Sequence, residues 1–147
     1  MRRHSFSKKS GTGLTEAQEA YLKIFYGLSA RVVHVNHLGA QLRLSTSDVS
    51  RLTEPLRRAG LCRYERFGFL ELTEEGRCWG AFLLRRQELA EQFLNRIGVA
   101  EDAEAALRLA HSLSPAATEG LEIFLMSLGD RSFYCNTESD PCQQENG

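Results

Sequence analysis

The sequence of 147 residues lacks a long apolar run, a close pair of cysteines and the side-chain patterns of common catalytic sites. Its longest apolar stretch, CWGAFLL at 78–84, ends at Arg85 and is far shorter than the ~20 residues of a membrane helix. The first residues, MRRHSFSKKSGTG, are basic but have no apolar segment behind them, so we expect no secretory signal. No Ser-His-Asp spacing, glycine-rich phosphate loop or pair of catalytic carboxylates occurs. These absences argue against a membrane protein and against an enzyme.

The four cysteines form no CxxC motif. Cys62 lies beside a predicted strand and Cys78 lies in an apolar helical run, so both are interpreted as buried thiols. Cys135 and Cys142 lie in a polar C-terminal segment. A disulfide, a metal site or a thiol sensor are alternatives for this pair, but free thiols of a reduced cytoplasm fit better. We therefore expect a cytoplasmic protein.

The net charge of −1 conceals two halves of opposite sign. Residues 1–70 hold 12 Lys and Arg against 5 Asp and Glu, a net charge of +7. Residues 71–147 hold 6 basic against 14 acidic residues, a net charge of −8. A basic half joined to an acidic half suggests a unit that faces nucleic acid, followed by a unit with another role.

Helical spacing of apolar residues predicts three helices in the basic half. The first covers 15–30 behind Thr15, and a short second helix covers 36–43 with Asn36 as its cap. The third follows Ser45 and ends at Gly60. The inward positions expected for the first helix are Ala17, Tyr21, Ile24, Phe25 and Leu28. Two short helices joined so closely indicate a helix-turn-helix.

Two segments after Gly60, at 61–67 and 69–73 around Gly68, have the pattern of a β-hairpin, which makes the unit a winged helix. Short hydroxyl side chains at the start of the third helix adjoin free backbone N–H groups, where a DNA phosphate is favoured. Asp48 is expected to cap this helix. Arginines farther along could hold phosphates or form a solvated rim. The predicted DNA-contacting residues are Ser45, Thr46, Ser47, Ser50, Arg51, Arg57, Arg58 and Arg66.

From residue 73 onward the pattern is helical, with expected helices at 73–98, 101–113 and 115–128. The inward positions of the last helix are expected to include Leu121, Phe124 and Leu125. The apolar side of the long helix exceeds the needs of a winged helix, which favours a homodimer interface. The residues predicted for that interface are Trp79, Phe82, Leu89, Phe93 and Ile97.

The expected fold is thus mostly α, with a winged helix-turn-helix followed by an α-helical dimerisation domain. The expected parts are a disordered basic tail at 1–14, a DNA-binding domain at 15–73, a helical dimerisation domain at 74–128 and a flexible tail at 129–147.

The chain resembles the metal-dependent repressors typified by the diphtheria toxin repressor and the manganese transport regulator. The resemblance rests on EAYLKIFYGL (19–28), LGAQLRLSTSDVSRLTEPLRRAGL (38–61), YERFGFLELTEEG (64–76) and RRQELAEQFLNRIGV (85–99). It implies a dimeric winged-helix transcription regulator that binds Mn²⁺ or Fe²⁺ and then binds double-stranded operator DNA. The wing lacks the usual Arg-Gly pair of the family and has Gly68-Phe69.

Most metal-ligand positions implied by the resemblance are replaced. The ligand positions now hold Ala20, Lys23, Gln87, Leu107 and Ala110. Only His111 and, from an ancillary site, Glu91 remain as candidate ligands, and each has a structural alternative. His111 could be a satisfied core histidine, and Glu91 could pair with Arg86 or Arg96. Because Mn²⁺ and Fe²⁺ need several converging donors, we expect an inactive site in which Lys23 replaces the cation by pairing with Glu91 or a neighbouring carboxylate.

The function predicted from the sequence is a DNA-binding transcription regulator whose metal control is altered or lost. Two alternatives stay open: a winged-helix module that binds a protein partner, and a thiol-responsive regulator.

Overall fold

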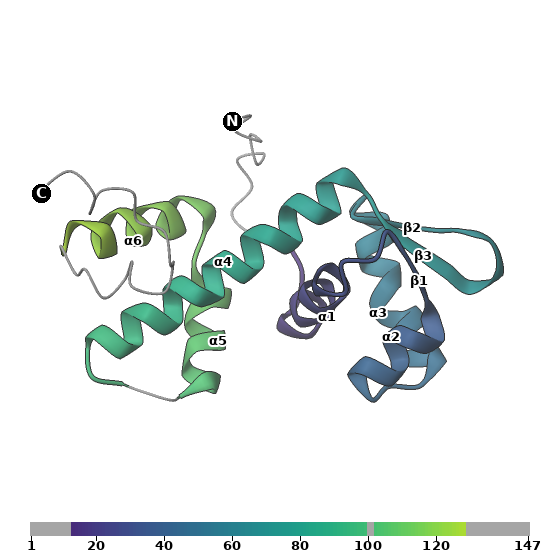
Figure 1. Ribbon diagram of the computed structural model, residues 1–147, viewed down its shortest axis with the longest axis horizontal. Helices are drawn as coiled ribbons and strands as arrows, with labels where there is room; N and C mark the ends of the chain where they lie inside the picture. The colour runs from purple at the N-terminus through teal and green to yellow at the C-terminus, as the bar shows by residue number, and fades with distance from the viewer. Residues whose placement is uncertain (1–12, 100–101, 129–147) are drawn as a thin grey trace, which may run out of the picture.

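The computed structural model describes residues 13–99 and 102–128 and is mostly helical (Figure 1). The tails at 1–12 and 129–147, with Cys135 and Cys142, lie outside the described residues. None of the helices in the described part of the chain is long and apolar enough to cross a membrane. The elements are α1 (Glu16–Gly27), β1 (Val32–His34), α2 (Val35–Leu42), α3 (Thr46–Arg58), β2 (Cys62–Tyr64), a 3-10 turn (Arg66–Gly68), β3 (Phe69–Leu72), α4 (Glu74–Arg96), α5 (Ala103–Ser112) and α6 (Pro115–Ser127).

Helix caps explain where the helices of the winged helix begin. The side chain of Thr15 accepts the Gln18 N–H, which confirms the predicted cap of α1. The predicted cap of α2 is wrong, because the Asn36 N–H donates to Nδ1 of His34 at 3.1 Å and His34 is the cap. Asp48 is not the cap of α3 either. Its N–H donates to Ser45 Oγ, and its carboxylate accepts from the same hydroxyl at 2.6 Å.

A three-stranded antiparallel sheet has the order β1-β3-β2. The predicted hairpin is confirmed, with Cys62 opposite Leu72 and Tyr64 opposite Leu70. Strand β1 was not predicted, because three residues are too few to show an alternating pattern. It pairs Val33 with Leu70 and joins the start of α2 to the wing. Figure 1 shows the hairpin and the α2–α3 pair at the same end of the molecule, away from α5 and α6.

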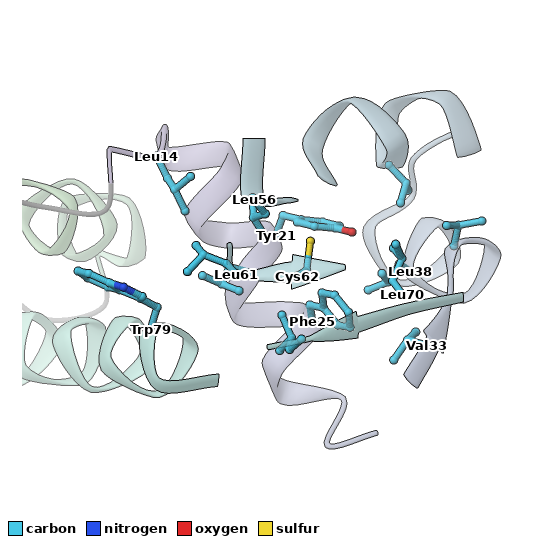
Figure 2. Packing of buried hydrophobic residues seen from close by; sticks show 14 of the residues in the cluster. Leu14, Tyr21, Phe25, Val33, Leu38, Leu56, Leu61, Cys62, Leu70 and Trp79 are labelled. Atoms are coloured by element: carbon cyan, nitrogen blue, oxygen red, sulfur yellow. The ribbon is translucent and has the colours of Figure 1, made fainter. Parts of the chain in front are cut away.

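Helix α4 connects the winged helix to α5 and α6 and packs against α1 (Figure 1). Two glycines one turn apart allow α4 to approach Leu61 and α1 closely. A Cβ at Gly76 would lie 1.8 Å from the Leu61 carbonyl oxygen, and one at Gly80 would lie 2.6 Å from Cβ of Tyr26. Figure 2 shows Trp79 at the edge of the cluster that contains Tyr21, Phe25 and Leu61. The first turns of α4 therefore contribute to the core of the winged helix.

The second half of α4 packs on α5 and α6 through few buried apolar side chains. The buried apolar residues here are Leu89, Ala90, Ala106, Ala110 and Leu125. Arg85 also bonds to Glu122 on α6 at 2.7 Å. Three residues expected to face inward are exposed, because too few elements surround these helices to cover all their apolar positions. They are Ala17, Ile24 and Phe124.

Candidate functional site

The outward face of α3 carries the hydroxyl groups that the sequence assigns to DNA. Ser45, Thr46, Ser47, Ser50 and Arg51 are all exposed. The opposite face is anchored by Val49, Leu56 and Thr53, all fully buried. The Thr53 hydroxyl lies 2.7 Å from the Tyr21 hydroxyl, and burial raises the pKa of Tyr21 above its usual value. This inner side fixes the rotation of α3, so that its hydroxyl edge points away from the core.

Three arginines predicted to contact DNA are paired with acids on their own helix. Arg57 and Arg58 both bond to Glu54, at 2.7 and 3.1 Å, and these bonds lower the pKa of Glu54 to about 2. Arg51 lies 3.4 Å from Asp48. Exposed ion pairs contribute little and can exchange partners, so a phosphate could replace the carboxylates. Even so, the charge that α3 presents is smaller than its arginine count suggests.

Two arginines of the winged helix have no acidic partner among the described residues. One is the predicted Arg66 at the wing tip, and the other is Arg43, which sequence reasoning missed. Arg43 ends α2 in a left-handed conformation, with φ 56°, two residues before Ser45, the cap of α3. Its position between two closely spaced helices was visible in the sequence, but an arginine in a turn carries no specific pattern.

The base of the wing is held by a buried carboxylate. Glu71 on β3 has only 6% of its side chain exposed, and it accepts bonds from Arg31 at 2.8 Å and Arg63 at 2.7 Å. These two arginines lower the pKa of Glu71 to about 2. Arg63 therefore serves the wing itself, which makes it less available for DNA.

The positions implied as metal ligands on α1 and α4 do come together. Ala20, Lys23 and Gln87 line one pocket between the two helices, with Ile24 and Leu84. The Lys23 ammonium donates to Oε1 of Gln87 at 2.7 Å, and the Gln87 amide donates to Oε1 of Glu91 at 3.0 Å. Partial burial lowers the pKa of Lys23 from its usual value, and the nearby Glu19 opposes that shift. The lysine thus reaches α4 through Gln87 and does not bond directly to Glu91.

A second set of bonds joins α1 to α4 and α5. Arg86, with 4% of its side chain exposed, donates to Oε2 of Glu19 at 2.5 Å and to the Leu113 carbonyl at 3.3 Å. Nδ1 of His111 lies 2.8 Å from the same Glu19 oxygen. Since a carboxylate only accepts, Nδ1 carries the hydrogen. His111 is half-buried and engaged with Glu19, and Arg86 bonds to Glu19 rather than to Glu91.

These residues do not fit a divalent cation. The two candidate ligands belong to separate hydrogen-bonded chains, Glu91 with Gln87 and His111 with Glu19. Lys23 places an ammonium beside the pocket, and Ala20 and Ala110 offer no donor atom. Leu107 is exposed on α5. Within 13–99 and 102–128, no three His, Cys, Asp or Glu side chains form a group that could hold a metal ion.

The residues predicted for a dimer interface are in different environments. Trp79 and Leu89 are buried inside the chain, Phe82 and Phe93 are partly buried, and Ile97 is 58% exposed. Large apolar residues are also exposed on α6. Ile123 is 61% exposed, and Phe124 and Met126 are about half exposed. In the helical part after the wing, the most exposed large apolar residues are therefore Ile97 and those along α6 rather than most of the predicted α4 stripe.

Comparison with known proteins shows that the chain is similar to known transcription regulators. Residues 73–131 match the family described as iron dependent repressor, metal binding and dimerisation domain. The transcriptional regulator MntR of Lysinibacillus sphaericus is 33% identical over 90 residues, which cover 60% of this chain and 65% of that protein. MntR of Bacillus subtilis is 32% identical over 90 residues, covering 60% and 63%. The chain thus spans just under two thirds of these relatives.

Solved structures of two regulators are also similar to this chain. The manganese regulator SloR has a TM-score of 0.62 and 29% identity, covering 76% of this chain and 54% of that one. ScaR with bound Zn²⁺ has a TM-score of 0.62 and 26% identity, covering 74% and 53%. The matched curated relatives are transcription regulators rather than enzymes. In sequence and in fold, the chain is similar to metal-dependent repressors of the diphtheria toxin repressor and manganese transport regulator type.

Proposed function

We propose that this protein is a dimeric DNA-binding transcription regulator whose winged helix is fixed to its helical domain by side chains instead of Mn²⁺ or Fe²⁺. The observation that carries the proposal is Lys23. Its ammonium bonds to Gln87 in the pocket where the family resemblance implies metal ligands. A permanent positive charge at this place supplies the attraction between helices without an exchangeable ion.

DNA binding is supported by the exposed hydroxyl edge of α3 and by the arginines on either side of it. The N-terminus of α3 presents backbone N–H groups and Thr46 and Ser47 to solvent, which suits a phosphate. Arg43 and Arg66 have no acidic partner among the described residues, so neither needs to break an ion pair to bind DNA. Arg51 is the candidate for a base contact in the major groove.

The connection between the two parts of the molecule is supported by two separate sets of bonds. Lys23, Gln87 and Glu91 form one chain of hydrogen bonds from α1 to α4. Arg86 and His111 converge on Glu19 and tie α1 to α4 and α5. The second set is buried, so breaking it would leave Glu19 as an uncompensated charge. Together these bonds favour one fixed arrangement of α1 on α4.

A winged-helix module for a protein partner is a second candidate. It is favoured by the internal pairing of Arg57 and Arg58 with Glu54, which reduces the field that would attract DNA. The two functions differ in their response to salt. Affinity for duplex DNA should fall steeply as salt rises, because phosphate contacts release counterions.

Metal titration and DNA binding on the same protein test the first proposal. We expect anaerobic calorimetry with Mn²⁺ and Fe²⁺ to show no stoichiometric micromolar binding, and duplex binding to be equal with metal and with chelator. The control is a variant with the family's ligand types restored: Ala20→Asp, Lys23→Glu, Gln87→His, Leu107→Glu and Ala110→Glu. This variant should gain metal binding. Micromolar binding by the natural chain that His111→Ala abolishes would contradict the proposal.

A further inference from the structure

The tip of the wing holds an aromatic residue in a backbone conformation that disfavours it. Phe67 has φ 61° and ψ 35°, and Gly68 follows with φ 79°. The Phe69 N–H donates to the Arg66 carbonyl across these two residues. Positive φ at both central positions is the pattern of hairpin turns that favour Asn-Gly, because a Cβ is crowded in the left-handed region. A phenylalanine at the first position makes the turn less stable than an asparagine would.

Burial does not compensate for this strain. Phe67 is 87% exposed, more than any other large apolar residue in the described part of the chain. Its neighbour Phe69, by contrast, packs edge-on against His34 with ring centroids 5.0 Å apart. Neither turn preference nor packing within the chain explains the ring at position 67. A strained backbone beneath an exposed aromatic side chain suggests contact with something outside the chain.

The structure also holds this turn in place. Nε2 of His34 lies 3.1 Å from the Phe67 carbonyl oxygen, and the Glu65 N–H donates to the Phe69 carbonyl at 2.7 Å. A Cβ at Gly68 would lie 3.1 Å from Nε2 of His34, so the turn is packed closely against the end of β1. The ring of Phe67 is therefore presented from a fixed support at the end of the hairpin.

The residue beside this ring indicates what it contacts. Arg66 is exposed and has no acidic partner among the described residues, so a cation accompanies the apolar ring at the tip. We propose that Phe67 enters the minor groove of bound DNA as a wedge between neighbouring base pairs, while Arg66 holds a flanking phosphate. Inserted apolar side chains partly unstack a base step and kink the duplex by roughly 20–90°. This inference rests on the proposed DNA-binding function.

DNA bending tests the wedge directly. The full chain is first used to select a duplex from a random-sequence pool. The selected duplex is then labelled at both ends for energy transfer, and versions of it are made with 2-aminopurine at successive base steps. With the natural protein we expect a bend and brighter 2-aminopurine at one step. Phe67→Ala should lose both signals and at least about fivefold in affinity. Phe67→Leu, which keeps an apolar wedge, should retain most of the bend.

Two further variants separate the wedge from folding and from charge. Phe67→Asn suits the turn, so its thermal midpoint should equal or exceed that of the natural chain while the bend is lost. Arg66→Ala should weaken binding to every duplex and reduce the salt slope by about one, yet leave the bend in place. If no duplex is recovered at all, the DNA-binding proposal fails with this one. If DNA binds but Phe67→Ala changes neither bend nor affinity, only the wedge is overturned. The exposed ring would then be assigned to contact with a protein partner.

Discussion

Lys23 places a covalently held positive charge where the family resemblance implies a metal ion. A bound ion leaves when its concentration falls, whereas a lysine side chain cannot leave. Burial lowers the pKa of Lys23, so keeping the ammonium charged here costs free energy that an exposed lysine would not lose. The bond to Gln87 and the attraction of Glu19 and Glu91 offset this cost. Where the metal ligands are replaced, the groups around Lys23 therefore stabilise its ammonium.

Replacing Lys23 by methionine tests whether this charge holds α1 on α4. Lys23→Met keeps the length of the side chain and removes the bond to Gln87, so we expect urea unfolding to show a loss of about 0.5–1.5 kcal/mol. DNA affinity should also fall, and Mn²⁺ should not restore it. Arg108→Met is the matched control, because Arg108 pairs with Glu104 on the surface of α5 and joins no two helices. Equal stability and affinity in both variants would remove Lys23 from the junction.

At the scale of secondary structure, sequence reasoning succeeded where a pattern is long or a cap is strong. The helices around Tyr21, Leu56 and Leu125 and the hairpin around Gly68 were predicted because periodicity, caps and turns agree there. It missed β1, whose three residues form a strand only because β3 is beside them. It also assigned Trp79 to a dimer interface, since a helical stripe does not say whether its partner is the same chain or another.

The candidate site was less predictable for the same reason. The replacement of ligands could be seen in the sequence, but the partner of each remaining group could not. Glu19 was not singled out at all, although it bonds to both Arg86 and His111. These two residues lie 67 and 92 positions farther along the chain. Such contacts depend on how α1 crosses α4, which the sequence suggests only through the small residue Gly80.

The wing should lose stability in acid through Glu71. The folded-state pKa of Glu71 is about 2, below its usual 4.5, so the unfolded chain binds the proton more tightly. The contribution of Glu71 is therefore complete above about pH 5 and is lost as the pH falls from 4.5 through 2. In urea titrations across this range, Glu71→Gln should unfold with a weaker dependence on pH than the natural chain. Some dependence should remain, because Glu54 also has a pKa of about 2. An unchanged pH profile would contradict the bridging role of Glu71.

For the whole molecule, the distribution of apolar surface indicates where two copies meet. The α4 stripe is largely used inside the chain, with Trp79 in the winged-helix core and Leu89 covered by its neighbours. Helix α6 instead leaves several large side chains open, namely Ile123, Phe124, Met126 and Leu128. A run of this kind at the end of the molecule away from the wing would leave both winged helices free for DNA.

We therefore expect a homodimer whose contact includes α6, and Ile123→Asp should dissociate it. Ile123 is 61% exposed in the single chain, so an aspartate there is solvated in the monomer but desolvated in a dimer. Sedimentation equilibrium at micromolar concentration should show a dimer for the natural chain and a monomer for the variant, with the same helical circular dichroism. Leu89→Asp is the contrasting variant, because Leu89 is fully buried and its replacement should unfold the chain rather than separate two folded copies. Duplex DNA binding should weaken for Ile123→Asp, since a monomer holds one half-site instead of two. A natural chain that sediments as a monomer would contradict the dimer, and a variant that stays dimeric would move the contact away from α6 to the surface around Ile97.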